Sequence, residues 1–114
     1  MVTQQEHDEA LERGRELIRN NPGAVRVRFD KELRQVIVEL NRGFSITFPP
    51  ERAQGLENAS DEDLSEIEIN SSGLGIYFPR IDADLWVPAL AKGRFGNDRW
   101  EAAWAAAHSQ DKAA

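Results

Sequence analysis

The spacing of hydrophobic residues changes along this chain from a helical period to the two-residue period of a strand. Over residues 3–20 the apolar or small residues fall on one helical face, at Ala10, Leu11, Gly14, Leu17 and Ile18. Acidic residues lie mainly in the first half of this segment and arginines in the second, an order that suits the helix dipole. Because the apolar stripe is thin, we expect a helix that is weakly held or completes its burial against a partner.

The middle of the chain alternates between apolar and polar residues, which is typical of half-buried strands. Three such segments follow one another: Val25, Val27 and Phe29; then residues 33–40, with Val36, Val38 and Leu40 on one face; then Phe44, Ile46 and Phe48. Short turns at 30–32 and 41–43 join them, which predicts an antiparallel meander. Residues 67–69 and 76–78, joined by the SSGLG turn at 71–75, predict a second hairpin.

Short helical segments accompany these strands. We expect one helical turn at 51–56, a cap at Ser60, a short helix at 88–93, and a final helix that Asn97 caps. Residues 81–88 follow no clear pattern. The prediction is an α+β fold, with a small antiparallel sheet of two hairpins or a meander, short helices, and one helix at each end. We expect a single domain over 1–114: an N-terminal helix (1–23), a core (24–96), and a C-terminal helix and tail (97–114).

Composition and charge narrow the class of function. A length of 114 residues suits one domain, and 40% hydrophobic residues is too many for a disordered chain. The net charge of −6 argues against a nucleic-acid-binding domain. The chain has no cysteine, no apolar run near ~18 residues, and no basic-then-apolar N-terminus. We therefore expect a cytoplasmic protein with no membrane segment, disulfide or thiolate site.

The steepest local charge bias lies between Glu57 and Glu68, a segment with six acidic residues and no basic one. Such a run is most often a solvated surface with a helix cap. The functional alternative is an acidic patch that meets a basic protein, because complementary charge speeds association and selects partners. The candidate partner-binding residues in this segment are Asp61, Glu62, Asp63 and Glu66.

Asp82 and Asp84 form a second acidic feature. The common explanation is turn chemistry, in which Asp accepts backbone N–H groups. If both lay in one strand they would point the same way and contact a partner's basic residues. With nearby Tyr77 they would also suit a divalent cation or a small ligand, although the calcium-loop spacing is absent.

Three tryptophans are many for a chain of this length. Core packing is the usual role for Trp86, Trp100 and Trp104, but tryptophan is also enriched at interface hot spots. Trp100 and Trp104 share a face of an Ala-rich helix, so they are the better candidates for a contact surface. His7 and His108 are expected to be exposed, and no catalytic or metal-binding constellation is present. We predict no catalytic residue, metal site or cofactor.

Many short blocks of this sequence, in order, resemble one bacterial family. They are RGFSITFP at 42–49, QGL at 54–56, ASDEDLS at 59–65, EIEI at 66–69, SSGLGIYFP at 71–79, IDADL at 81–85, PAL at 88–90 and GRFG at 93–96. Between residues 42 and 100 the chain is similar to the family catalogued as domain of unknown function 2442, with a looser match over 29–40.

The resemblance implies a small α+β domain on the antitoxin side of bacterial toxin–antitoxin pairs, and it implies no catalytic residues. Our leading hypothesis is a non-enzymatic protein-binding domain that covers a small basic, toxin-like partner. The acidic residues of 57–68 with Asp82 and Asp84 would face that partner, and Trp100 and Trp104 or the N-terminal helix would supply apolar anchors. Two alternatives stay open: a ligand-binding or divalent-metal-binding domain that uses Asp82 and Asp84, and a homo-oligomeric accessory domain.

Overall fold

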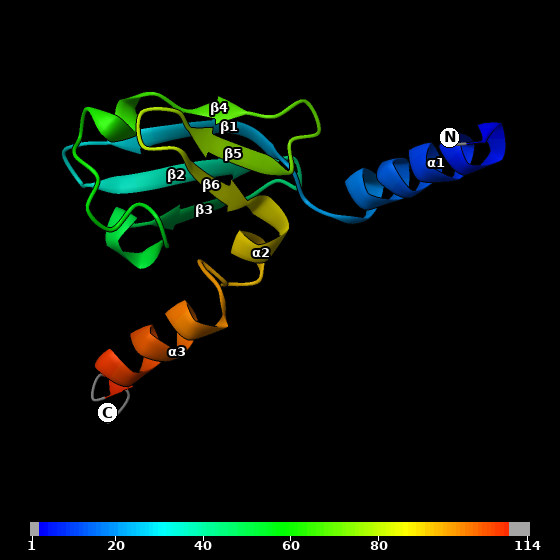
Figure 1. The fold of residues 1–114 in the computed structure, drawn as a ribbon. Helices are drawn as coiled ribbons and strands as arrows, with labels where there is room; N and C mark the ends of the chain where they lie inside the picture. Colours follow the sequence, from blue (N-terminus) through cyan, green and yellow to red (C-terminus); the bar gives the residue numbers. More distant parts are fainter. Residues whose placement is uncertain (1–2, 110–114) are drawn as a thin grey trace.

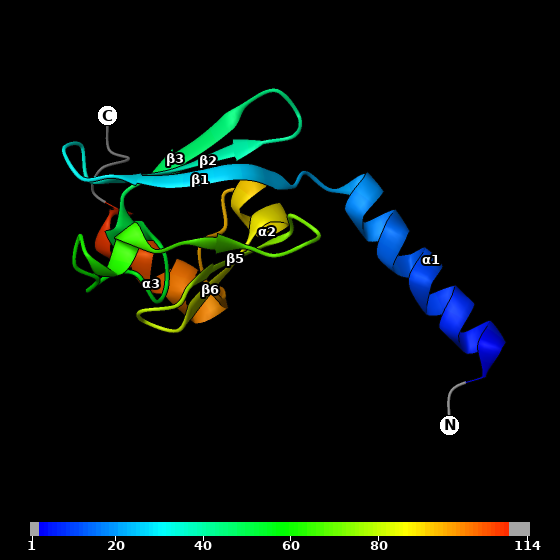
Figure 2. The same ribbon diagram turned by 90° about the horizontal axis from the view of Figure 1, so that it is seen from above.

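A computed structural model describes residues 3–109. Two three-stranded antiparallel sheets face each other, one helix projects from the body, and another lies beside it (Figures 1 and 2). The elements run α1 (Gln4–Asn20), β1 (Ala24–Asp30), β2 (Gln35–Leu40), β3 (Ser45–Phe48), η1 (Pro50–Arg52), η2 (Asp63–Ser65), β4 (Glu68–Ile69), β5 (Gly75–Phe78), β6 (Ala83–Trp86), α2 (Val87–Ala91) and α3 (Asp98–Ala107). The α+β prediction is confirmed.

The first sheet has the order β1-β2-β3, which confirms the meander. Val36, Val38 and Leu40 are buried on its inner face, as their spacing predicted. The second strand begins later than expected, because the Asp30 carboxylate accepts the N–H groups of two residues in the turn. Leu33 therefore lies in the turn with 67% of its surface exposed, and the strand starts at Gln35.

The start of β1 also differs from the prediction. The register with β2 shifts between Ala24 and Arg26, so Val25 lies in a bulge. Ala24 is buried in its place, and Val25 is 63% exposed. Val27 and Phe29 do pack against the core. A bulge depends on the partner strand, so alternation in one strand alone does not reveal it.

The second sheet has the order β4-β5-β6, and its β4–β5 pair confirms the second hairpin. Residues 83–86, for which the sequence made no prediction, form the third strand, with Ala83 and Leu85 buried. The core lies between the two sheets, and the connecting segments complete it with Leu56, Leu64 and Leu90. The helical turn expected at 51–56 is shorter and begins earlier, since 3-10 geometry covers Pro50–Arg52 (η1) and residues 53–56 form non-helical turns.

The helix predicted at the N-terminus is present as α1, which Thr3 caps by accepting the Glu6 N–H at 3.0 Å. It has no buried residue and extends away from both sheets (Figures 1 and 2). Its C-terminal end is fixed to the body, because the Arg42 guanidinium donates to the carbonyls of Arg19 (2.8 Å) and Asn21 (3.1 Å). The helix predicted there is present, and its thin apolar stripe is not buried against the described part of the chain, residues 3–109.

The last helix, α3, begins where Asn97 was predicted to cap it, with the Asn97 side chain accepting the Trp100 N–H at 2.8 Å. The end of the segment predicted as a C-terminal helix and tail (97–114) lies outside the described residues from 110 onward. None of the helices within residues 3–109 has the length and apolar character needed to cross a bilayer.

Candidate protein-binding surfaces

Arginines of this chain pair with most of the acidic segment that the sequence singled out. Arg80, in the turn after β5, lies 3.4 Å from Glu62, 3.5 Å from Asp63 and 3.7 Å from Glu66. The Asp63 carboxylate also accepts the backbone N–H of Ser60, while its own N–H donates to the Ser60 hydroxyl. The two hydrogen bonds with Ser60, followed by Arg80, lower the pKa of Asp63 below its ordinary value.

Asp61 is paired in the same way by an arginine from the turn between β1 and β2. The Arg34 guanidinium contacts Asp61 at 2.8 Å and Glu51 at 3.0 Å, and it donates to the Ala59 carbonyl at 2.9 Å. A hydrogen bond from the backbone N–H of Glu51 itself, followed by Arg34, lowers the pKa of the Glu51 carboxyl below its ordinary value. Asp61, Glu62, Asp63 and Glu66 therefore offer less free charge to a partner than the sequence suggested.

Asp82 and Asp84 do not lie in one strand, contrary to the arrangement considered from the sequence. Asp82 is in the turn before β6, with a positive φ of 50°, and it accepts the Tyr77 hydroxyl at 2.8 Å. Asp84 is in β6, directly opposite Tyr77, and Glu68 of β4 is opposite Tyr77 on the other side. The hydrogen bond to Asp82 raises the pKa of Tyr77, and burial and the charges of Asp82, Asp84 and Glu68 raise it further.

Trp86 lies on this same outer face, since it is two residues beyond Asp84 in β6. Core packing was the usual expectation for it, but its surface is 47% exposed. Gly75, which has no side chain, is its cross-strand neighbour, so nothing on β5 covers the indole at that position. We call Glu68, Tyr77, Asp82, Asp84 and Trp86 the acidic sheet face. Within residues 3–109 none of its three carboxylates has an ion-pair partner.

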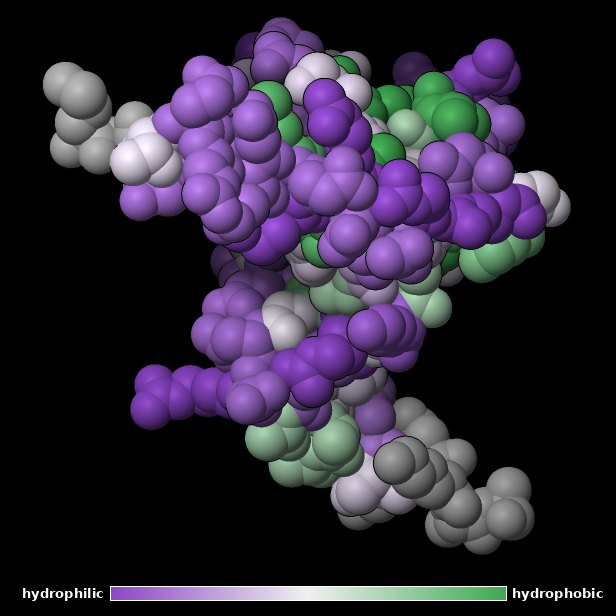
Figure 3. Space-filling model, turned by 90° about the vertical axis from the view of Figure 1, so that its right-hand side faces the viewer, coloured by the Kyte–Doolittle hydropathy of each residue, from purple (hydrophilic) through white to green (hydrophobic). Residues whose placement is uncertain are grey.

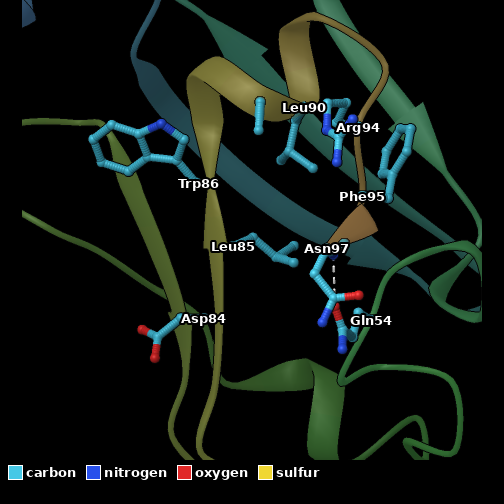
Figure 4. A pocket seen from close by; sticks show the side chains of 10 residues that line it. Gln54, Asp84, Leu85, Trp86, Leu90, Arg94, Phe95 and Asn97 are labelled. Atoms are coloured by element: carbon cyan, nitrogen blue, oxygen red, sulfur yellow. Dashed lines mark hydrogen bonds between the residues drawn. The ribbon is translucent and has the colours of Figure 1, made fainter. Parts of the chain in front are cut away.

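A cavity of about 320 Å³ lies beside β6, between this strand and the connection from α2 to α3. Figure 4 shows Asp84 and Trp86 on one side of the strand and Leu85 on the other, toward Asn97. The Asn97 N–H donates to the Gln54 side chain at 2.9 Å. Among the described residues, no group of three or more His, Asp or Glu side chains is placed to hold a metal ion. The cation-binding alternative for Asp82 and Asp84 gains no support from this geometry.

The inner side of α3 is attached to the body through Arg52. Its guanidinium lies over the rings of Phe95 (4.8 Å) and Trp104 (4.9 Å) and forms two hydrogen bonds to Glu101, at 2.6 and 3.0 Å. The indole N–H of Trp100 donates to the Arg52 carbonyl at 2.9 Å. The hydrogen bonds from Arg52, followed by the Phe95 N–H, lower the pKa of Glu101. These contacts hold the two tryptophans half-buried.

Trp100 and Trp104 also line an apolar groove of about 290 Å³ along α3, together with Ala103, Ala107 and His108. The sequence indicated this stripe but not its last member. His108 is half-buried rather than exposed, because its ring stacks on Trp104 with 3.9 Å between centroids. The acidic sheet face was also missed as a unit. The alternation of Ala83 and Leu85 with Asp84 and Trp86 was the signal that would have shown it.

Comparisons with known proteins place this fold among proteins of unknown function. Residues 24–96 match the family described as Protein of unknown function (DUF2442). A protein of unknown function from Rhodospirillum rubrum ATCC 11170 is 43% identical over 71% of this chain and 98% of its own, with a TM-score of 0.66. An uncharacterized protein from Chromobacterium violaceum is 31% identical over 90% of this chain and 94% of its own, with a TM-score of 0.70. No curated protein shows significant similarity to the chain.

Proposed function

The chain belongs to the family described as protein of unknown function (DUF2442), and within it we propose a non-enzymatic protein-binding domain whose acidic sheet face takes a basic partner. The observation that supports this is the set of three carboxylates, Glu68, Asp82 and Asp84, without an ion pair within residues 3–109 and beside the exposed Trp86. Carboxylates next to an exposed indole are suited to binding arginine and lysine. These side chains form charged hydrogen bonds with carboxylates and cation–π contacts with the indole ring.

The arginine-paired acids of the 57–68 segment have a different part in this proposal. To bind a cation of the partner directly, Glu62 or Glu66 would first have to give up its contact with Arg80. The segment still carries a net negative charge, because Arg34 and Arg80 are fewer than the acidic residues around them. Its effect is therefore long-range attraction, which raises the association rate more than the affinity.

The partner that fits is a small basic protein, such as the toxin of a toxin–antitoxin pair. A toxin that acts on RNA needs basic residues for the phosphates. A domain that presents free carboxylates to those residues would block the site. The apolar groove on α3, which Trp100 and Trp104 line, offers a second place for an apolar side chain of the same partner.

The test is affinity capture from native cells, at low salt, with three tagged versions of the full chain. The wild type is compared with the Asp84→Lys/Trp86→Ala variant and with a control that has the same charge change on α1, Asp8→Lys. We expect a small basic protein in stoichiometric amount with the wild type and the control, and its loss with the sheet-face variant. If the partner is retained by the sheet-face variant, or is acidic, the proposal is wrong.

A further inference from the structure

Helix α1 presents an apolar face that no other element within residues 3–109 covers. Leu11, Leu17 and Ile18 are 45%, 45% and 44% exposed, and the body contacts the helix only near its C-terminal end, through Arg42. Seen from the side to which α1 points, the surface is largely hydrophilic, with hydrophobic residues showing between the polar ones (Figure 3). Helices in proteins gain most of their stability from packing an apolar face against other elements, which α1 does not do within residues 3–109. We propose that α1 pairs in antiparallel orientation with α1 of a second copy of this chain.

The apolar face is self-complementary about its centre. Around Gly14 the apolar residues stand three and four positions to either side, at Ala10, Leu11, Leu17 and Ile18. A two-fold axis through Gly14 reverses the second helix and places Leu11 of one copy against Leu17 of the other. The same operation places Ala10 against Ile18. Such an isologous contact, in which one patch binds its own copy, is the usual basis of a dimer.

Gly14 itself has no explanation within one chain. Glycine is disfavoured in the middle of a helix relative to alanine. A Cβ built at Gly14 would meet no atom within 4 Å, and its backbone has no positive φ that requires glycine. The absence of a side chain does allow another backbone to approach closely at this point. The position of Gly14 at the centre of the symmetric stripe is where two antiparallel helices would cross.

Charge favours the antiparallel orientation. Residues 4–12 contain four acidic residues and no arginine or lysine, whereas residues 13–20 contain three arginines and one glutamate. Antiparallel pairing places each acidic half beside the basic half of the other copy, with Arg19 at the level of Glu9. Parallel pairing would put like charges together. It would also bring the two bodies to the same end, since each body follows the C-terminus of its α1 (Figures 1 and 2).

The expected affinity follows from the length of the contact. A helix of 17 residues is about 25 Å long. One helix pair therefore buries less than the roughly 1,200–2,000 Å² of a stable interface. The dimer should form in the micromolar range and exchange rapidly. It does not use the acidic sheet face, so it stands or fails independently of the proposed function.

The first measurement is sedimentation equilibrium of the full chain from about 1 to about 500 µM, a range that covers micromolar dissociation constants. Two variants each add one negative charge to an exposed position of α1: Leu17→Glu on the apolar face and Gln5→Glu on the opposite face. We expect Leu17→Glu to raise the dimer dissociation constant about tenfold or more, and Gln5→Glu to change it less than about threefold. The thermal midpoint of the body serves to show that both variants fold.

Orientation is tested by disulfide trapping, which is clean because the chain has no cysteine. Equal amounts of the Leu11→Cys and Leu17→Cys variants are mixed and oxidised. The antiparallel pair predicts that the mixed disulfide dominates over either homodimer. A chain that stays monomeric throughout the range, or a dimer that Leu17→Glu leaves intact, overturns the proposal. Homodimers of the Leu11→Cys variant as the main product would overturn the antiparallel arrangement.

Discussion

Replacing Arg52 by alanine should release α3 from the body while leaving the rest of the fold in place. The Arg52 side chain joins α3 and the loop before it to the body, because it contacts the rings of Phe95 and Trp104 and pairs with Glu101. Both charged side chains are largely covered, with 18% and 19% of their surfaces exposed. The core between the sheets includes no residue of α3, so the loss falls on the docking of this helix.

The magnitude follows from the contacts that are lost. The two ring contacts contribute about 0.5–1 kcal/mol each, and hydrogen bonds to a charged partner about 1.5–3 kcal/mol. Because contacts that share one side chain are not additive, we expect the docking of α3 to weaken by about 3 kcal/mol. That is on the order of a hundredfold in the equilibrium between docked and detached helix.

The assay is amide hydrogen exchange across residues 98–107, together with the tryptophan emission spectrum. We expect protection in α3 to fall about a hundredfold and the emission to shift to the red as Trp100 and Trp104 become hydrated. Arg99→Ala is the matched control, since Arg99 is in α3 but forms no ion pair within residues 3–109. If Arg52→Ala and Arg99→Ala behave alike, the account of how α3 is held is refuted.

Three further results are expected. Docking of α3 should hold at neutral pH and weaken as the pH falls through the lowered pKa of Glu101, measured by tryptophan emission; this pH dependence should vanish in Glu101→Gln. Gly73→Ala should destabilise the fold in urea by at least about 1 kcal/mol more than Gly43→Ala. Both glycines have positive φ, but only at Gly73 would a Cβ meet backbone, 3.2 Å away. Tyr77, the single tyrosine, should ionise at a higher pH than a free tyrosine, as measured by ultraviolet absorbance. The Asp82→Asn substitution should lower the pKa of Tyr77 toward its ordinary value. The stability from its hydrogen bond is therefore present below the unfolded pKa and lost as the pH rises through the folded one.

The elements that were correctly predicted depend on residues that are close in sequence. The helical stripe of residues 10–18, the alternation of 36–40 and the cap at Asn97 each involve neighbours within a few positions. The predictions that failed at Val25 and Leu33 involve the ends of strands. At Val25 the cause is a bulge, which depends on how β1 pairs with β2 and is not encoded by hydrophobic period. At Leu33 the cause is a local turn, in which the Asp30 carboxylate accepts two backbone N–H groups that the apolar spacing does not reveal.

The acidic residues also show the difference between what local sequence predicts and what only the folded chain reveals. The sequence identified the acidic residues but not their partners, because Arg34 and Arg80 come from other parts of the chain and approach them only after folding. Trp86, which was expected in the core, lies on the surface in the folded protein, on the same face of β6 as Asp84.

The sequence by itself determined the fold class, the order of most elements and the thin apolar stripe of α1, because local periodicity and capping carry that information. Within the part of the chain that the structure describes, only the tertiary structure decided which carboxylates remain without an arginine and that the two sheets leave α1 uncovered. These depend on contacts between segments distant in the chain, such as Arg34 with Asp61 and Arg42 with the end of α1.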